Sequence, residues 1–298
     1  RQTLFGEAAS DATSIEAENT AITNHGEISK GSYKARNALH VYNANDSTIT
    51  GGTFTGLETT LTNQAKLSGA KVEGTKTLTV KNTASIQNAT LTGGAATVDN
   101  HGENSVMKDV TLTGSALTIN NGGSLEGGSA KGDSLAIHNT GNVKDGAYSA
   151  DTGALTVTNS GKLSAGMYTA AGSLGITNEG TIENDTYTAG GALTYDGNAD
   201  SAASGTTMTG ASAEITNAGT LTNGSYTAET GAMTVTNSGT LTAGTYTAKA
   251  GTMDITNKGT IENGAYTSRG DLTYTDSADA SMSGSEMTSC LLYTSPSP

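Results

Sequence analysis

The sequence has few of the residues on which disulfide frameworks, thiolate metal sites and membrane helices depend. It contains one cysteine (Cys290), two prolines and no tryptophan among 298 residues, and charged residues make up only 14% of the chain. A single cysteine excludes an internal disulfide and a metal site built from several thiolates. No apolar run is long enough to cross a bilayer as a helix, so no membrane span is expected in this chain.

Basic residues are also scarce. The chain has 15 Lys and Arg against 28 Asp and Glu, which gives a formal net charge of −13 and a pI of about 4.6. Because binding to nucleic-acid phosphates requires clusters of basic side chains, nucleic acid is excluded as a partner. An acidic surface favours solubility, and it repels polyanionic glycans unless divalent cations bridge the two.

What the sequence does have is a repeat. An asparagine returns about every 19–20 residues, and Gly197 and Asp276 occupy the two places where it is missing. A fixed period in this range is typical of a solenoid, in which each unit buries its apolar face only by stacking on its neighbours. The landmark asparagines are Asn24, Asn43, Asn63, Asn82, Asn100, Asn121, Asn139, Asn159, Asn178, Asn217, Asn237 and Asn257.

Each landmark follows a segment with strict alternation. In one unit the apolar residues Met233 and Val235 alternate with Thr234 and Thr236. Period-two alternation predicts a strand with one buried face, and threonine suits its outward face. Asn-x-Gly after many landmarks indicates a turn. We therefore predict an all-β fold, a single-stranded parallel β-helix of about 14 coils with ~19–20 residues each.

The landmark asparagine shares the parity of the buried residues, so we expect it to point inward. Stacked amides in successive coils can hydrogen-bond to one another as a ladder. A tyrosine nine residues after the landmark has the same inward parity in seven units. We predict a core aromatic column rather than an exposed sugar-stacking strip, formed by Tyr33, Tyr148, Tyr168, Tyr187, Tyr226, Tyr246 and Tyr266.

The repeat divides the chain into three parts. Residues 20–289 form the predicted β-helix, and residues 1–19 fit the pattern poorly and are interpreted as a partial or frayed coil. Residues 290–298 leave the pattern and resemble a translated sequencing adapter; a native linker is the alternative.

Because the chain begins without methionine or a signal peptide, we expect it to be an internal fragment. The units at Asn43, Gly197 and Asp276 carry a two-residue loop insertion.

Few residues are candidates for chemistry. His25 and His101 follow landmarks in coils too far apart to share a substrate atom, and we interpret them as polar turn residues; His40 and His138 fall on outward strand positions. Acidic pairs in two inserted loops could bind Ca²⁺ or act as acid and base, although solvated loop charges are the favoured interpretation. No catalytic residue, metal site or cofactor is assigned, and the weak calcium candidates are Asp196, Asp200, Asp276 and Asp279.

Coils such as AMTVTNSGTLTAGTYTAKAG, from Ala232 to Gly251, resemble those of bacterial autotransporter passengers and related β-helical adhesins. The resemblance implies a right-handed β-helix, export across the outer membrane and display at the cell surface. It also implies a non-enzymatic role in adhesion or aggregation. The expected partners are host or bacterial cell-surface glycans or proteins, or further copies of the chain.

Two other functions remain open. A β-helical polysaccharide-processing enzyme, a lyase or glycosidase, requires a groove with carboxylates or basic residues clustered on adjacent coils. An ice-binding solenoid requires an unbroken threonine face.

Overall fold

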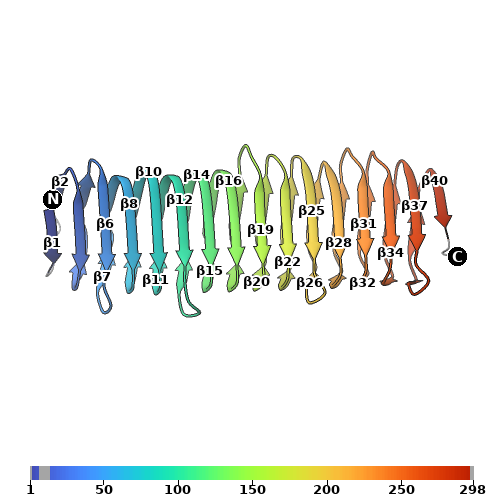
Figure 1. Cartoon of the computed structure of the whole chain (residues 1–298), viewed down its shortest axis with the longest axis horizontal. Coiled ribbons are helices and arrows are strands. Elements are labelled where there is room, and N and C mark those ends of the chain that lie inside the picture. The colour runs from blue at the N-terminus through green and yellow to red at the C-terminus, as the bar shows by residue number, and fades with distance from the viewer. Residues whose placement is uncertain (1, 7–13, 296–298) are drawn as a thin grey trace. The chain divides into compact units, whose positions relative to one another are not determined.

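The computed structural model describes residues 2–6 and 14–295. Across these residues the fold is all-β, with parallel strands stacked as a β-solenoid and no helix. The chain divides into two compact units, residues 1–149 and 150–298. Counted over both units, the described residues make about 14 turns. The predicted fold class is therefore confirmed, and Figure 1 shows the strands of each unit lying side by side.

Three strand types recur, and we name them by position. An asparagine strand ends at the landmark, a short middle strand follows the turn, and a tyrosine strand completes the coil. In unit 1 the two long types are fused in most coils. The long strands there are β1 (Gln2–Gly6), β2 (Ser14–Ala17), β3 (Thr20–Asn24), β5 (Ser32–Ala35), β6 (Ala38–Asn43), β8 (Thr53–Asn63), β10 (Lys71–Asn82), β12 (Thr90–Asn100), β14 (Thr111–Asn121) and β16 (Ser129–Asn139). Its middle strands are β4 (Glu27–Ile28), β7 (Thr48–Thr50), β9 (Lys66–Ser68), β11 (Ser85–Gln87), β13 (Val106–Lys108), β15 (Ser124–Glu126) and β17 (Asn142–Lys144), and β18 (Ala147–Ala150) contains the boundary between the units.

In unit 2 the three types are separate. The asparagine strands are β19 (Leu155–Asn159), β22 (Leu174–Asn178), β25 (Ala192–Gly197), β28 (Ser212–Asn217), β31 (Met233–Asn237), β34 (Met253–Asn257) and β37 (Asp271–Asp276). The middle strands are β20 (Lys162–Ser164), β23 (Thr181–Glu183), β26 (Ala202–Ser204), β29 (Thr220–Thr222), β32 (Thr240–Thr242), β35 (Thr260–Glu262) and β38 (Ser281–Ser283). The tyrosine strands are β21 (Met167–Ala170), β24 (Thr186–Ala189), β27 (Thr207–Gly210), β30 (Ser225–Ala228), β33 (Thr245–Ala248), β36 (Ala265–Ser268) and β39 (Glu286–Thr288), and β40 (Leu291–Ser295) follows them.

Parallel pairing places like residues on like residues. Met233, Val235 and Asn237 of β31 lie beside Met253, Ile255 and Asn257 of β34 in direct register. The inward side chains are buried and the residues between them are half-buried or exposed. Because a register slip of one residue would turn every apolar side chain outward, the alternating pattern fixes the register.

Buried amides connect the coils along this register. In unit 1 the Nδ2 of each landmark asparagine from Asn24 to Asn121 donates to the Oδ1 of the next, and all six distances are 2.8 Å. The amide nitrogen also reaches the middle strand of the next coil, as Asn43 Nδ2 does to the carbonyl of Lys66 at 3.1 Å. The ladder therefore links strands within one sheet and ties that sheet to the other.

Unit 2 has the same ladder with two substitutions. Asn159 donates to Asn178, and Asn217 to Asn237 to Asn257, at 2.8–2.9 Å. At Gly197, which has no side chain, the hydroxyl of Tyr195 accepts from Asn178 Nδ2 at 3.3 Å. Asn217 Oδ1 then lacks a hydrogen-bond partner within the described part of the chain.

Unlike Gly197, Asp276 accepts a hydrogen bond from the landmark asparagine of the preceding coil. Its Oδ1 accepts from Asn257 Nδ2 at 3.1 Å, and the hydroxyl of Tyr274 accepts from the same nitrogen at 3.3 Å. Both substituted coils thus carry tyrosine two residues before the landmark, where most coils have an aliphatic residue. The tyrosine hydroxyl supplies an acceptor at the altered rung.

A second in-register column distinguishes unit 1. Gly56, Gly74, Gly93, Gly114 and Gly132 lie beside one another where the tyrosine and asparagine strands are fused. A Cβ on Gly114 would lie 2.9 Å from the carbonyl oxygen of Gly93, so the bend has no room for a side chain. In unit 2 the corresponding turn is a loop and needs no such column.

Loop insertions all follow the landmark position. The predicted insertions occur after Asn43, Gly197 and Asp276, and the structure adds one after Asn100 that the sequence pattern did not reveal. There Met107 takes the register position of Ile86 and Leu125 but follows its landmark by seven residues instead of four. Within each unit, the inserted loops therefore extend from the same edge of the coils (Figure 1).

Strands also form near both ends of the described residues. In the segment interpreted as a partial coil, β1 pairs with β3 and β2 with β5. In the segment placed outside the repeat, β40 pairs with β37, because an extended segment can use the backbone groups of the preceding strand whatever its side chains. Residues 1, 7–13 and 296–298 lie outside the described residues.

The ladder predicts a specific loss of stability. Replacing Asn237 with leucine removes the acceptor of Asn217 Nδ2 and the donor to Asn257 Oδ1. Each stranded buried group costs roughly 1–3 kcal/mol, so Asn237→Leu should lower the urea midpoint of the full chain. The matched control is Thr234→Leu, an exposed position on the same strand, which should change stability by less than about 0.5 kcal/mol. Equal midpoints for both variants would contradict a stabilising ladder.

Candidate functional site

The predicted aromatic positions lie in the interior. All seven tyrosines are at most 5% exposed, and neighbouring rings stack face to face. Ring centroids are 4.7 Å apart for Tyr168 and Tyr187 and 4.8 Å for Tyr246 and Tyr266. In unit 1 the partner of Tyr33 is Phe54, at 4.9 Å. These rings are therefore packed against one another and leave no aromatic face for a sugar.

The tyrosine strands also explain a recurring glycine. A Cβ on Gly224 would lie 2.3 Å from the hydroxyl of Tyr226, and Gly146, Gly166, Gly244 and Gly264 are in similar contact with their tyrosines. The position two residues before the tyrosine therefore favours glycine. In the coil of Asn178 this position is Asp185, the one buried carboxylate among the residues whose burial is described.

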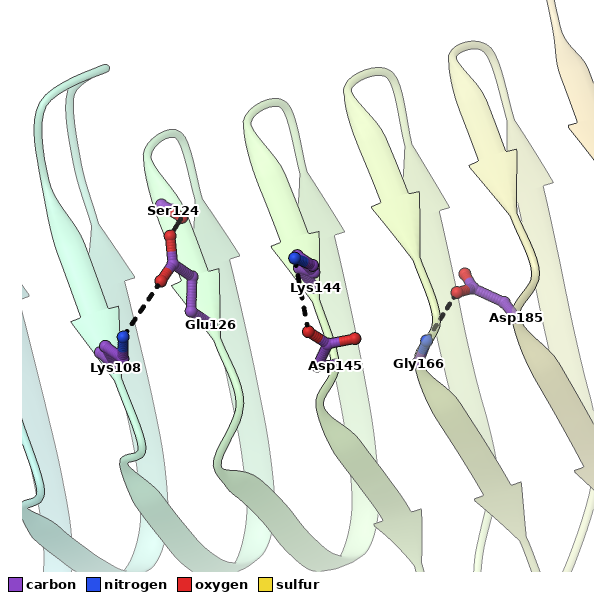
Figure 2. Close-up of polar contacts among 7 residues, drawn as sticks. All are labelled: Lys108, Ser124, Glu126, Lys144, Asp145, Gly166 and Asp185. Atoms are coloured by element: carbon purple, nitrogen blue, oxygen red, sulfur yellow. Dashed lines mark hydrogen bonds and ion pairs between the residues drawn. The ribbon is translucent and has the colours of Figure 1, made fainter.

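Two hydrogen bonds hold the Asp185 side chain. The backbone N–H of Gly166, in the preceding coil, donates to Oδ1 at 2.7 Å, and the Tyr187 hydroxyl donates to Oδ2 at 2.9 Å. Figure 2 shows the carboxylate reaching toward Gly166. Burial raises the pKa of Asp185 to about 6, although both hydrogen bonds act in the opposite direction; Glu183 adds a smaller increase. Burial likewise raises the pKa of Tyr187.

Asp185 should make stability depend on pH. Below about pH 4 its carboxyl is neutral in both folded and unfolded chains, so burial carries no charge penalty. As the pH rises through about 6, the folded chain must ionise this buried carboxyl, and the free energy of unfolding falls. A shift of roughly two pKa units corresponds to about 3 kcal/mol. Asp185→Asn should therefore be more stable than the parent near pH 7.5 and lose that advantage near pH 4, as measured by urea midpoints.

The control for this prediction is Asp254→Asn, an exposed position on β34. Its difference from the parent should stay constant across the same pH range. If Asp185→Asn also showed a constant difference, the buried carboxyl would not be the titrating group.

The four predicted calcium candidates differ in burial and in their positions in the coil. Asp196 is exposed on β25, whereas Asp200 lies in the following turn, where its N–H donates to Asn198 Oδ1 at 3.1 Å. Asp276 is half-buried at the end of the ladder, and Asp279 is exposed in its loop. Among the described residues there is no group of three or more His, Cys, Asp or Glu side chains able to hold a metal ion.

Two of the histidines border a groove in unit 1. This groove of about 440 Å³ lies at the end of the asparagine strands β10, β12, β14 and β16. One wall is formed by the residues just before the landmarks, which are in register: Lys81, Asp99, Asn120 and His138. The opposite side is formed by the residues just after the landmarks: Thr83, His101, Gly122 and Thr140. His25 and His40 are not part of this groove.

Unit 2 has a hollow of similar volume, about 440 Å³, over β19, β22, β25 and β28. Threonines provide most of its polar lining, with Asp196 and Glu214 from adjacent coils. Thr194 pairs with Glu214 and Asp196 with Thr216, so the two carboxylates occupy diagonal positions on one sheet face.

The tyrosine strands of unit 2 carry an unbroken outward threonine column. Successive members are direct register partners across seven strands, and all are half-buried or exposed. Four adjacent coils add a second hydroxyl two residues earlier, from Thr186, Thr207, Ser225 and Thr245. The unbroken column is Thr169, Thr188, Thr209, Thr227, Thr247, Thr267 and Thr288.

Comparison with known proteins gave no match: no protein-family model, curated protein or solved structure is similar to this chain. Within residues 2–6 and 14–295, no helix is both long and apolar enough to cross a lipid bilayer.

Proposed function

We propose that this chain is part of a non-enzymatic, surface-displayed β-helical adhesin of the autotransporter type, acting in adhesion or aggregation. The observation that carries the proposal is the contrast between the inside and the outside of the coils. Inward positions repeat the same asparagine, aliphatic and tyrosine residues, whereas some outward positions differ between coils, as Thr234 and Asp254 do on β31 and β34. A scaffold with a repeated interior and a varied exterior suits display of binding surfaces.

The placement of loops and grooves supports the same conclusion. Insertions occur at one edge of the coils, and those after Asn100 and Asp276 leave the ladder hydrogen bonds in place. Each unit also has a surface concavity lined by polar outward residues. Several weak contacts along such a surface can together give firm attachment, since linked sites bind at high effective concentration.

Coated beads test the proposal. Beads carrying the purified full chain should clump with one another or be retained on surfaces bearing cell-wall or host glycans, more than beads carrying serum albumin. Retention and clumping are counted by microscopy and turbidity. Equal behaviour of the two bead types, with circular dichroism showing a folded coupled protein, would contradict the proposal.

One observation favours a second candidate, ice binding. The unbroken threonine column of unit 2, doubled in four adjacent coils, is the regular hydroxyl array that this function requires. Strands in one sheet lie ~4.8 Å apart, which sets the spacing between successive threonines. In the flanking coils the second column is broken by Met167 and Ala265.

Ice recrystallisation separates the two candidates. If the array binds ice, the full chain should keep ice crystals small during annealing, and the double change Thr209→Lys with Thr227→Lys should abolish the effect. Thr234→Lys, exposed on an asparagine strand outside the array, should retain it. Crystal growth equal to that in buffer would eliminate ice binding.

A further inference from the structure

The groove in unit 1 differs from the rest of the surface in its chemistry. The residue before the landmark is threonine in six of the seven coils of unit 2, and the exception is Asp196. Across four successive coils of unit 1 the same position is Lys, Asp, Asn and His. Because threonine satisfies this strand position elsewhere, the fold does not require the four different side chains.

These four side chains also contribute little to the stability of the fold. Lys81 and His138 are exposed, and Asp99 and Asn120 are half-buried. The amide of Asn120 donates to the Asp99 carboxylate across the two coils. A surface contact of this kind contributes little to folding, but it fixes the orientation of two polar groups at the centre of the groove.

The groove is also shaped for a ligand. Its volume of about 440 Å³ falls within the ~300–1,000 Å³ range of small-molecule sites. The buried ladder amides of Asn100 and Asn121 lie behind it, and Gly122 leaves one side without a side chain. The inserted loop after Asn100 begins at its edge with His101. Rigid strands thus position the wall, and one loop borders it.

The charges in the groove point to a neutral ligand. Lys81 lies in register beside Asp99, so one positive and one negative charge offset each other. The remaining groups offer hydrogen-bond donors and acceptors together, from carboxylate, amide, imidazole and hydroxyl. Such a set matches adjacent sugar hydroxyls, each of which both donates and accepts, and it does not match a phosphate or sulfate.

We propose that this groove is a saccharide-binding site for a neutral sugar unit of a glycan, with Asp99 and Asn120 at its centre and Lys81, His101 and His138 around them. The proposal rests on the adhesive function proposed above and names its ligand class. An anionic glycan and a peptide are outcomes that would overturn it.

Gly122 allows a direct test, because a Cβ there meets no atom closer than 3.5 Å. Gly122→Leu should therefore fill the groove without disturbing the coil. The matched control is Ala218→Leu, at the same coil position in unit 2 and outside the groove. Thermal unfolding of both variants checks that the fold is intact, and Asp99→Ala removes a binding group without filling the space.

Binding is measured by titration calorimetry on the full chain with lactose, mannotriose, maltotriose and chitotriose, and with heparin as the anionic probe. At least one neutral sugar should bind, and Gly122→Leu and Asp99→Ala should each weaken it about tenfold or more. Ala218→Leu should bind like the parent. Binding of heparin alone, of no neutral sugar, or equal binding by Gly122→Leu would overturn the site.

The bead assay separates this site from the broader function. If Gly122→Leu beads clump and adhere like the parent while no sugar titrates, the groove is not the binding site but the adhesive function stands. If beads carrying the parent chain neither clump nor adhere although a neutral sugar binds in the groove, the adhesive function fails and the site stands.

Discussion

The buried amide ladder is the interaction on which the rest of each unit depends. An amide removed from water is costly unless both its donors and its acceptor are used, and in this corner the amides of the neighbouring coils and the carbonyls of the middle strands supply the partners. The coils must therefore stack in exact residue register, as Asn63 on Asn82 does at 2.8 Å. That register in turn aligns the aliphatic rows, stacks the tyrosine rings and leaves the outward side chains free to vary.

Much of this arrangement could be predicted from the chain alone. The alternation around residues such as Val235 and the return of asparagine determine strands, parity and parallel stacking, and they gave the correct fold class. The glycine column from Gly56 to Gly132 also repeats in the sequence, as a glycine seven or eight residues before five successive landmarks, but it was not predicted because most other coils lack it. The insertion after Asn100 was missed because Met107 was not matched to the aliphatic position of neighbouring coils.

The grooves and the buried carboxylate could not be predicted in this way. Lys81, Asp99, Asn120 and His138 are separated by a whole coil each, and only the parallel register brings them into one wall. Asp185 occurs in a turn pattern that elsewhere contains glycine, so its burial depends on the tyrosine strand that covers it. In a solenoid, the side chains that share a surface come from equivalent positions of successive coils. These positions are far apart in the sequence, so a local motif does not reveal them.

The amide ladder has one further consequence. In every described rung the nitrogen donates toward the later coil, so all the side-chain dipoles point the same way and their fields add along the stack. A run of such rungs therefore has a net dipole whose positive end faces the later coils, as aligned peptide units do in a helix. Asp276 lies at that positive end in the run from Asn217, where its negative carboxylate is stabilised by the aligned dipoles of three amides.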